Sequence, residues 1–504
     1  MTSIALQLAC SIPGIEEYIC NAISERKDIA NQSLRDQWHQ LIIRPLSELK
    51  SNNSYPSSYL FIVDALDECD SENDIRMILQ LLTEARMLKT VQLRVFLTSR
   101  PEGPIRQGFY YTPHGEYKDF VLHSIAPNIV DHDISIFVEY NMGAIKQERC
   151  LEAGWPGPEA SRCLVRNSNG LFIWAATACR FIREGKKRQI IESRLSSVLR
   201  STGSINEPGR HLNEIYMTVL RHSIPPQFSD EERQEFCSKL RNILGCLVVL
   251  LSPLSIHSLS TVLCISEKDV DETLEDLHAI LNIPKDHIHP LYLHHPSFRD
   301  VLLSNDRCTD LNFWVDKKES HQMLANSCIQ LMSSSLKQNI CGLNTPGMLV
   351  TDVERSRIEQ YLPPDVQYAC VYWIQHLQKS GAQLHDNDRV HQFLEVHLLH
   401  WLEALGWIGK TSEGIRAMFS LDTQIQVRHF YKAVLERYLG LYILRLITTL
   451  AYMRLSVMQS NLSYTTNGYL HKLLSNYIIR HLSLPQRIAL LKDSSEIIFQ
   501  RESK

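Results

Sequence analysis

The first third of the chain switches between helical and strand-like patterns of hydrophobic residues. Residues 1–50 carry apolar side chains at helical spacing, in IALQLACSIPGIEEYICNAI and again in SLRDQWHQLIIRPLSELK. After the polar run SNNSYPSS, the stretch YLFIV (59–63) predicts a buried strand, residues 71–89 predict an amphipathic helix, and LRVFLTS (93–99) predicts a second buried strand. Strand, helix and strand in this order indicate a parallel α/β layer.

The strand signal fades after about residue 125. The run DFVLHSIAP (119–127) predicts at most a short third strand, and GLFIWAATACRFIREG (170–185) predicts a strongly apolar helix. Residues 236–304 hold three helical patterns and, near their end, the strand-like run LYLHH, an alternation that suits a small winged-helix unit. From about residue 311 onward the pattern predicts helices joined by polar segments.

The composition is that of an ordinary globular protein, and it mainly serves to exclude other classes of protein. Of the 504 residues, 44% are hydrophobic and 21% are charged, and the net charge of -4 offers no basic face for a nucleic-acid backbone. The 13 cysteines include no CxxC pair, so we expect a reduced, cytoplasmic chain. No apolar run reaches the roughly 18 residues of a membrane span, and CLVVLLSPL (246–254) and LYILRLITTLAYMRL (441–455) predict buried helices instead.

Three acidic residues follow the first predicted strand, in the stretch YLFIVDALDECD. Asp64 stands at the carboxyl end of the strand, where it would hold a magnesium ion through water. Asp67 and Glu68 lie about one turn further on and could polarise a water for attack on a terminal phosphate. The alternative is a buried strand in which Asp64 only caps the next helix.

The second predicted strand ends in a cation. Arg100 follows LRVFLTS directly, at the position where a neighbouring parallel strand would present its charge to a γ-phosphate. Open α/β sheets bind ligands at the carboxyl ends of their strands, which favours a phosphate-sensing arginine. A surface salt bridge is the alternative role for this residue.

VDALDEC followed by LTSRPE resembles the NACHT subgroup of STAND signalling NTPases, especially the fungal heterokaryon-incompatibility-like proteins. GLFIWAATACRFI is similar to the helical segment after the nucleotide core of this family, and LYLHHPSFRDVLLS resembles its winged-helix signature. VQYACVYWIQHL and VHQFLEVHLLHWLEAL resemble the helical linker that commonly precedes WD repeats in the fungal proteins. The resemblance thus continues along nearly the whole chain.

The resemblance implies a fold of the α/β class followed by mostly α-helical domains. Residues 1–150 would be a truncated P-loop NTPase-type core with a parallel sheet, and residues 151–235 a helical domain. Residues 236–310 would form a winged-helix-like domain, and residues 311–504 the α-helical linker. In the family, the missing strand of the core would sit in mid-sheet beside YLFIV, so we expect its loss to expose backbone groups and apolar surface.

The resemblance also implies a molecular switch with ATP or ADP and Mg²⁺ as cofactors. Asp64 would be the Walker B residue that holds the metal, Asp67 and Glu68 the catalytic acidic pair, and Arg100 the sensor arginine. ADP would hold the nucleotide core against the winged helix, and exchange for ATP would open the molecule and let it oligomerise. The implied partners are therefore proteins, either further copies of the chain or full-length relatives, with no nucleic acid and no membrane.

A histidine of the winged helix completes the implied nucleotide site. His295, in HPSF, would face the β-phosphate of ADP, and His294 beside it is a rival for this role. The alternative for either residue is a histidine that is simply packed in the protein.

The phosphate loop of the family lies upstream of the segment that corresponds to IALQLACSIPGIEEYI, and nothing before Asp64 matches GxxxxGK[ST]. ALGWIGKT (404–411) fits a relaxed form of this pattern. A phosphate loop needs a strand before it and a helix after it, whereas HQFLEVHLLHWLEAL predicts an amphipathic helix that ends near Gly409. We therefore expect ALGWIGKT to be a helix end and nucleotide binding to be impaired.

Three functions follow from these observations and remain open at the level of sequence. The first is a nucleotide-dependent switch in self/non-self recognition or defence, which the resemblance implies. The second is a non-catalytic protein-interaction module that pairs with full-length relatives. The third is a piece of a longer protein that carries the missing loop. The acidic residues and Arg100 favour the first function, while the absent loop favours the others and predicts negligible ATP hydrolysis.

Overall fold

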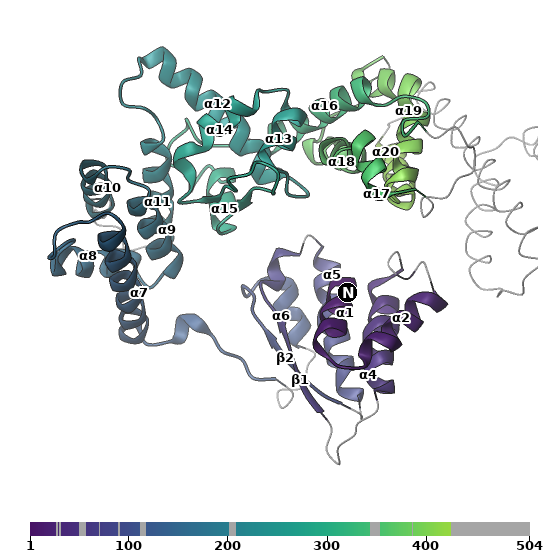
Figure 1. The fold of residues 1–504 in the computed structure, drawn as a ribbon, viewed down its shortest axis with the longest axis horizontal. Helices are drawn as coiled ribbons and strands as arrows, with labels where there is room; N and C mark the ends of the chain where they lie inside the picture. Colours follow the sequence, from purple (N-terminus) through teal and green to yellow (C-terminus); the bar gives the residue numbers. More distant parts are fainter. Residues whose placement is uncertain are drawn as a thin grey trace, which may run out of the picture. The chain divides into compact units, whose positions relative to one another are not determined.

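A computed structural model of the chain describes residues 1–424, except for residues 27–28, 30–31, 50–56, 70, 89–90, 111–116, 201–207, 343–352 and 386. The chain divides into two compact units, residues 1–125 and residues 126–504 (Figure 1). Each unit has its own hydrophobic core. The predicted helix at 441–455 lies outside the described residues.

The first unit begins with a layer of short helices, as the helical spacing of residues 1–50 predicts. Ser33 begins the third helix, because its hydroxyl oxygen accepts a hydrogen bond from the backbone N–H of Asp36 at 3.1 Å. Trp38, Ile42 and Leu46 are fully buried and form the centre of the core of this unit. The elements are α1 (Thr2–Ser11), α2 (Ile15–Glu25), α3 (Leu34–Trp38), a π-helical turn (His39–Ile43) and α4 (Arg44–Glu48).

Both predicted strands form and pair with each other in parallel, but neither is buried along its length as predicted. β1 (Ser57–Val63) and β2 (Val91–Leu97) run in a register that places Ser57 opposite Val91 and Val63 opposite Leu97. The predicted amphipathic helix connects them as α5 (Glu72–Glu84), and α6 (Gly103–Tyr110) follows β2 (Figure 1). β2 pairs with one edge of β1 over seven residue pairs, so within the described residues each strand of this two-stranded sheet keeps one edge without a ladder partner.

The two faces of this sheet are covered differently. On one face, Phe61 is buried in the core beneath the N-terminal helices, while Val63 and Leu97 pack against the cluster formed with α5 and α6. On the other face, Leu60 and Ile62 are 61% and 68% exposed. Phe96 lies opposite Ile62 in the register and is 54% exposed. The expectation of exposed apolar surface on the sheet is thus met on one face.

The expected third strand does not form. Residues 119–127 run without strand structure and include a single 3₁₀ turn (Leu122–Ser124), and the sheet of the first unit has two strands within the described residues. A strand needs a neighbour for its N–H and C=O groups, and this segment has none in the described ladder. The α/β prediction therefore holds only for a small two-stranded sheet in a mostly helical chain.

The second unit opens with five helices. They share a core to which Trp174, Phe181 and Tyr216 contribute fully buried aromatic rings. The first of these helices packs against the second and third, so it belongs to this unit although residues up to 150 were assigned to the core domain from the sequence. The helices are α7 (Pro127–Glu148), α8 (Pro158–Ser168), α9 (Phe172–Arg183), α10 (Arg188–Arg200) and α11 (Pro208–His222).

Three helices and a short hairpin follow. A capping box begins the first helix, since Ser229 accepts from the backbone N–H of Glu232 at 3.3 Å and Glu232 accepts from that of Ser229 at 2.8 Å. The predicted strand-like run LYLHH contributes one strand of an antiparallel pair. The elements are α12 (Asp230–Val249), α13 (Ile256–Leu263), α14 (Glu267–Leu274), a 3₁₀ turn (Glu275–Leu277), β3 (Leu281–Asn282), β4 (Tyr292–Leu293) and α15 (Ser297–Leu303).

The remaining described helices extend the same core. Trp373 and Trp401 meet edge to face with ring centroids 5.6 Å apart, which locks two of the helices together. The core of the second unit is continuous from Ile134 to Leu421. The helices are α16 (Lys317–Ser335), α17 (Arg355–Tyr361), α18 (Pro364–Ser380), α19 (Arg389–Trp407) and α20 (Thr411–Gln424). Among the described helices, none is both long and apolar enough to cross a membrane.

Candidate functional site

Four of the predicted site residues meet at the carboxyl ends of the two strands. Asp64 follows β1 directly, Asp67 and Glu68 lie in the 3₁₀ turn Leu66–Glu68, and Arg100 stands three residues beyond β2. Because β1 and β2 are parallel neighbours, their carboxyl ends lie at the same edge of the sheet. The structure thus brings together the acidic residues and the arginine that the sequence singled out.

Thr98, which was not predicted from the sequence, holds the turn after β1 in place. Its hydroxyl oxygen accepts a hydrogen bond from the backbone N–H of Ala65 at 2.8 Å, and the hydroxyl also hydrogen bonds to the Asp64 carboxylate. Its carbonyl oxygen accepts from the N–H of Leu66 at 3.0 Å. Ala65 adopts a left-handed conformation with φ of 50°, which turns the chain sharply after the strand. The signal for this residue in the sequence is a hydroxyl side chain directly after the second strand.

Asp67 and Arg100 bind each other. The Arg100 Nε–H donates to Asp67 Oδ2 at 2.7 Å, and the Arg100 backbone N–H donates to Asp67 Oδ1 at 3.0 Å. The Asp67 side chain is 5% exposed, whereas that of Arg100 is 51% exposed. Both oxygens of the carboxylate therefore have protein partners, and the guanidinium group partly faces solvent.

The electrostatics of this pair keep Asp67 charged. Burial acts to raise the pKa of its carboxyl group, but hydrogen bonds from the Arg100 side chain and backbone, together with the charge of Arg100, lower it below the usual value. The surroundings thus keep the carboxyl group of Asp67 ionised. A group held this way suits a structural ion pair better than a proton-transferring residue.

The three carboxylates at this edge differ in their partners and in their exposure. Magnesium prefers several oxygen ligands, and two exposed carboxylates, Asp64 and Glu68, are of the right chemical type. Asp67 is committed to Arg100. No group of three or more His, Cys, Asp or Glu side chains that could hold a metal occurs among the described residues. Magnesium binding at Asp64 therefore stays a prediction.

His295 lies in the second unit, at the start of α15. Its Nδ1 accepts from the backbone N–H of Ser297 at 3.1 Å and lies 2.7 Å from the Ser297 hydroxyl. Ser297 Oγ is in turn 2.8 Å from the hydroxyl of Tyr216 on α11, where both residues are buried. The rival His294 donates from Nε2 to the carbonyl oxygen of His278 at 3.0 Å, and burial lowers the pKa of His294. Both histidines thus have defined partners, and their phosphate-binding roles stay predictions.

The segment ALGWIGKT joins two helices. α19 ends at Trp407, Gly409 has a left-handed φ of 70°, and α20 begins at Thr411. The N–H of Lys410 donates to the carbonyl oxygen of Leu405 at 2.9 Å, and that of Gly409 to Gly406 at 3.2 Å, which is the Schellman pattern of a helix end. The expectation of a helix end is confirmed here, and no strand precedes the segment.

A buried pair of histidines links α16 and α18. His321 and His376 are 1% and 0% exposed, and their Nδ1 atoms lie 2.8 Å apart. The Tyr368 hydroxyl is 2.7 Å from His376 Nε2 and accepts from the backbone N–H of Leu251 at 3.3 Å. Burial lowers the pKa of His321 to about 4 and that of His376 to about 3. Both rings are therefore neutral at pH 7 and act as parts of the core.

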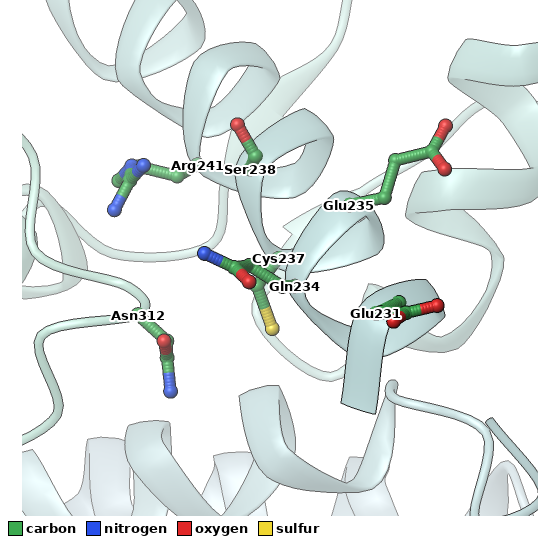
Figure 2. A pocket seen from close by; sticks show the side chains of 7 residues that line it. All are labelled: Glu231, Gln234, Glu235, Cys237, Ser238, Arg241 and Asn312. Atoms are coloured by element: carbon green, nitrogen blue, oxygen red, sulfur yellow. The ribbon is translucent and has the colours of Figure 1, made fainter. Parts of the chain in front are cut away.

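A shallow cavity of about 440 Å³ lies beside α12 in the second unit (Figure 2). Its lining combines the carboxylates of Glu231 and Glu235 with Arg241, whose Nη1 donates to the carbonyl oxygen of Leu311 at 3.5 Å. Asn312 faces α12 from the opposite side of the cavity (Figure 2). None of the residues predicted from the sequence lines this cavity, so it is separate from the strand-end site.

Comparison with known proteins agrees with the resemblance in the sequence. Residues 1–100 match the family described as Nephrocystin 3, N-terminal. Over 386 residues the chain is 24% identical to the Vegetative incompatibility protein HET-E-1 of Podospora anserina. The similarity covers 72% of this chain and 26% of that relative, so the chain corresponds to about a quarter of its length. The chain is thus distantly similar to a fungal incompatibility protein.

Proposed function

We propose that this chain is a module of a NACHT-type signalling protein that acts in self/non-self recognition or defence, with nucleotide binding impaired in the 504-residue polypeptide. The similarity to an incompatibility protein over 72% of the chain supports the signalling role. The observation that carries the proposal is the meeting of Asp64, Asp67, Glu68 and Arg100 at one edge of a parallel sheet, where open α/β sheets bind ligands.

The contacts of the strand-end residues support impaired binding. Arg100 binds both oxygens of the nearly buried Asp67 carboxylate, so Asp67 cannot act on a water without breaking this pair, whereas the Arg100 side chain is half exposed. Asp64 and Glu68 carry negative charge and would repel phosphate groups unless a cation lay between them. The only relaxed phosphate-loop sequence, ALGWIGKT, lies at a helix end. We therefore propose that this polypeptide hydrolyses ATP negligibly.

The second unit would contribute the regulatory part of such a protein. The elements from α12 to α15 come in the order of three helices, an antiparallel hairpin and a further helix, which supports a winged-helix domain. His295 follows β4 within this domain. In the proposed switch, His295 contacts the nucleotide phosphate in the closed state. We propose a cytoplasmic protein that works with protein partners, either further copies of itself or full-length relatives.

Calorimetry with MgATP and MgADP tests the proposal on the whole chain. We expect no binding in the micromolar range for the wild type. Micromolar ATP affinity that is lost in Asp64→Ala would show a working site at the strand ends and would contradict impaired binding. Loss of such affinity in Lys410→Ala instead would move the site to ALGWIGKT. Lys239→Ala is a matched control, because Lys239 is an exposed lysine of α12 paired with Glu235.

A second candidate function is a non-catalytic protein-interaction module. The exposed sheet face of Leu60, Ile62 and Phe96 favours it, because apolar side chains gathered on one face commonly mark a contact surface. The two functions differ in their dependence on nucleotide. An interaction module would bind its protein partner equally in the presence and absence of MgATP, whereas a switch would change its partner affinity.

A further inference from the structure

One histidine holds the loop between β3 and β4, residues 283–291, against a preceding helix. His287 Nδ1 lies 2.9 Å from Glu267 Oε1, and His287 Nε2 lies 3.2 Å from Asp271 Oδ1. Glu267 and Asp271 stand four residues apart on α14, so both carboxylates lie on the same side of that helix. The ring of His287 therefore bridges two acids of one helix.

The geometry fixes the protonation state of His287. An ionised carboxylate can only accept hydrogen bonds, and a neutral imidazole has one N–H donor. Because each ring nitrogen of His287 faces a carboxylate oxygen, both contacts form only when both nitrogens carry a proton. His287 is therefore an imidazolium in this structure. The hydrogen bond to Glu267 and the charges of Asp271 and Glu267 accordingly raise the pKa of His287.

The loop has few other attachments to the helices. The backbone N–H of His257 on α13 donates to the carbonyl oxygen of His287 at 3.4 Å, and that of Leu291 donates to the carbonyl oxygen of Leu254 at 2.9 Å. Ile288 is 79% exposed, so it buries little apolar surface at the loop tip. Within the described residues, the polar side-chain contacts between this loop and α14 are those of His287.

His257 is the other titratable group at this contact. Its Nδ1 lies 3.1 Å from Glu267 Oε2, so the carboxylate of Glu267 joins two histidines. The hydrogen bonds from His257 and His287 lower the pKa of Glu267, which keeps it ionised. His257 is also within electrostatic reach of the buried Asp365 of α18. His257 joins α13 to α14, however, and its side chain does not hold the loop.

The charged groups of the loop itself contact one another. The carboxylate of Asp286 binds the ring of His289, and its Oδ1 accepts from the backbone N–H groups of Ile288 at 3.2 Å and His289 at 3.1 Å. These contacts stabilise the turn at the loop tip and do not reach α14. The attachment of the loop to α14 therefore depends on the charge of His287.

We propose that His287 is a pH-sensitive latch, which as an imidazolium holds the β3–β4 loop against α14 and releases it when the proton is lost. A neutral ring donates from one nitrogen only, so one of the two carboxylates would then face a lone pair. A histidine with a raised pKa contributes stability that is fully present below its unfolded pKa of about 6.5 and is lost as the pH rises through the folded pKa. The latch does not involve a nucleotide.

Nitrogen-15 NMR of the histidine-labelled whole protein measures the charge of His287. Its signals are assigned as those missing in His287→Gln, and we expect a titration midpoint above that of His132, an exposed histidine of α7. Asp271→Asn should lower the midpoint, because it removes one of the two carboxylates. Glu272→Gln is the matched control, since it removes the same charge from α14 at a residue that pairs with Lys268.

Hydrogen–deuterium exchange of the whole chain measures the release of the loop. The exchange rate of residues 283–293, relative to that of the unfolded chain at the same pH, should rise about two- to fivefold between about pH 6.5 and about pH 9, because exposed ion pairs contribute little each. In His287→Gln the relative rate should be raised at both pH values. Residues 172–183 of the largely buried α9 are the internal reference and should show no such rise.

Three results would overturn the latch. A His287 midpoint at or below that of His132 would contradict the imidazolium. Loop exchange that is independent of pH in the wild type would mean that the ion pairs do not hold the loop. A pH dependence that persists unchanged in His287→Gln would assign it to another group, and its loss in His257→Gln would identify that group as His257.

Discussion

Arg100 Nε lies 2.7 Å from Asp67 Oδ2, and the Arg100 backbone N–H binds the other oxygen of the same carboxylate. The pair joins the turn after β1 to the segment after β2, 33 residues further along the chain. The two residues meet because the parallel strands β1 and β2 place their carboxyl ends side by side at one edge of the sheet. The acid and the arginine that the sequence suggested for a phosphate are here each other's partner.

Arg100→Ala should destabilise the first unit. The substitution leaves the nearly buried Asp67 carboxylate without its charged partner, and we expect a loss of about 1–2 kcal/mol because Arg100 is half exposed and screened. Urea unfolding followed by the fluorescence of Trp38 would measure the change. Arg106→Ala, at an exposed arginine of α6, is the control. Equal stability of both variants would mean that the ion pair contributes nothing measurable.

The contribution of this pair should disappear in acid. The pKa of Asp67 is lower in the folded protein than in the unfolded chain, where it is about 3.9. The stabilisation is therefore fully present above that unfolded value and is lost as the pH falls through the folded pKa. The difference in urea midpoint between wild type and Arg100→Ala should shrink below about pH 4. A difference that stays constant from pH 7 to pH 3 would speak against this linkage.

The exposed sheet face should promote self-association. Ile62 is 68% exposed beside Phe96, and apolar surface on an open sheet favours contact with another chain. Light scattering of the whole chain should show association that Ile62→Lys reduces. Gln92→Lys adds the same charge at an exposed position of β2 and should have less effect. A monodisperse wild-type monomer would contradict this prediction.

The second unit should remain soluble when expressed alone, provided that the fragment begins at the boundary between the two units. The sequence suggested a boundary near residue 236, which falls inside α12 (Asp230–Val249). The core runs without interruption from Ile134, so a fragment from residue 236 would lose part of it. A fragment of residues 126–504 should therefore scatter less light than one of residues 236–504. The opposite order would place the boundary where the sequence suggested it.

The histidine pair should make the second unit acid-sensitive. His321 and His376 have pKa values of about 4 and about 3 in the folded state, against about 6.5 in the unfolded chain. The unfolded state thus binds protons first, so stability is present above about pH 6.5 and falls steadily as the pH drops toward 4. Protonation of both rings would also set N–H against N–H across the Nδ1 contact. His321→Gln should reduce the slope of stability against pH.

His132→Gln provides the control for that measurement, since His132 is exposed on α7. Its slope between pH 6.5 and pH 4 should match that of the wild type. If His321→Gln shows the wild-type slope as well, the acid sensitivity arises elsewhere in the chain.

Two glycines in ALGWIGKT should respond oppositely to alanine. Gly409 has a φ of 70°, and no heavy atom lies within 4 Å of an added Cβ, so Gly409→Ala should cost about 1 kcal/mol through backbone strain alone. Gly406 lies within α19 with equally open space, and Gly406→Ala should stabilise the helix by about 0.5–1 kcal/mol. Thermal unfolding compares the two. A loss of stability in Gly406→Ala would mean that the substitution disturbs the helix packing.

The sequence by itself determined the features that depend on neighbouring residues. The helical spacing of residues 1–50, the apolar runs of YLFIV and LRVFLTS, and the helix end at Gly409 all appear in the structure. Each rests on interactions within a few residues, such as the left-handed φ that glycine adopts easily. The order of the acidic residues and Arg100 after the two strands also placed them correctly at one edge of the sheet.

Only the tertiary structure decided what these residues touch. The pairing of β1 with β2 left residues 119–127 without a strand partner and turned Asp67 and Arg100 toward each other. The contact of His321 with His376 joins residues 55 positions apart. Such contacts form only where two segments far apart in the sequence bury enough surface together to offset the entropy lost in closing the long loop between them. A local sequence pattern does not record which segments these are.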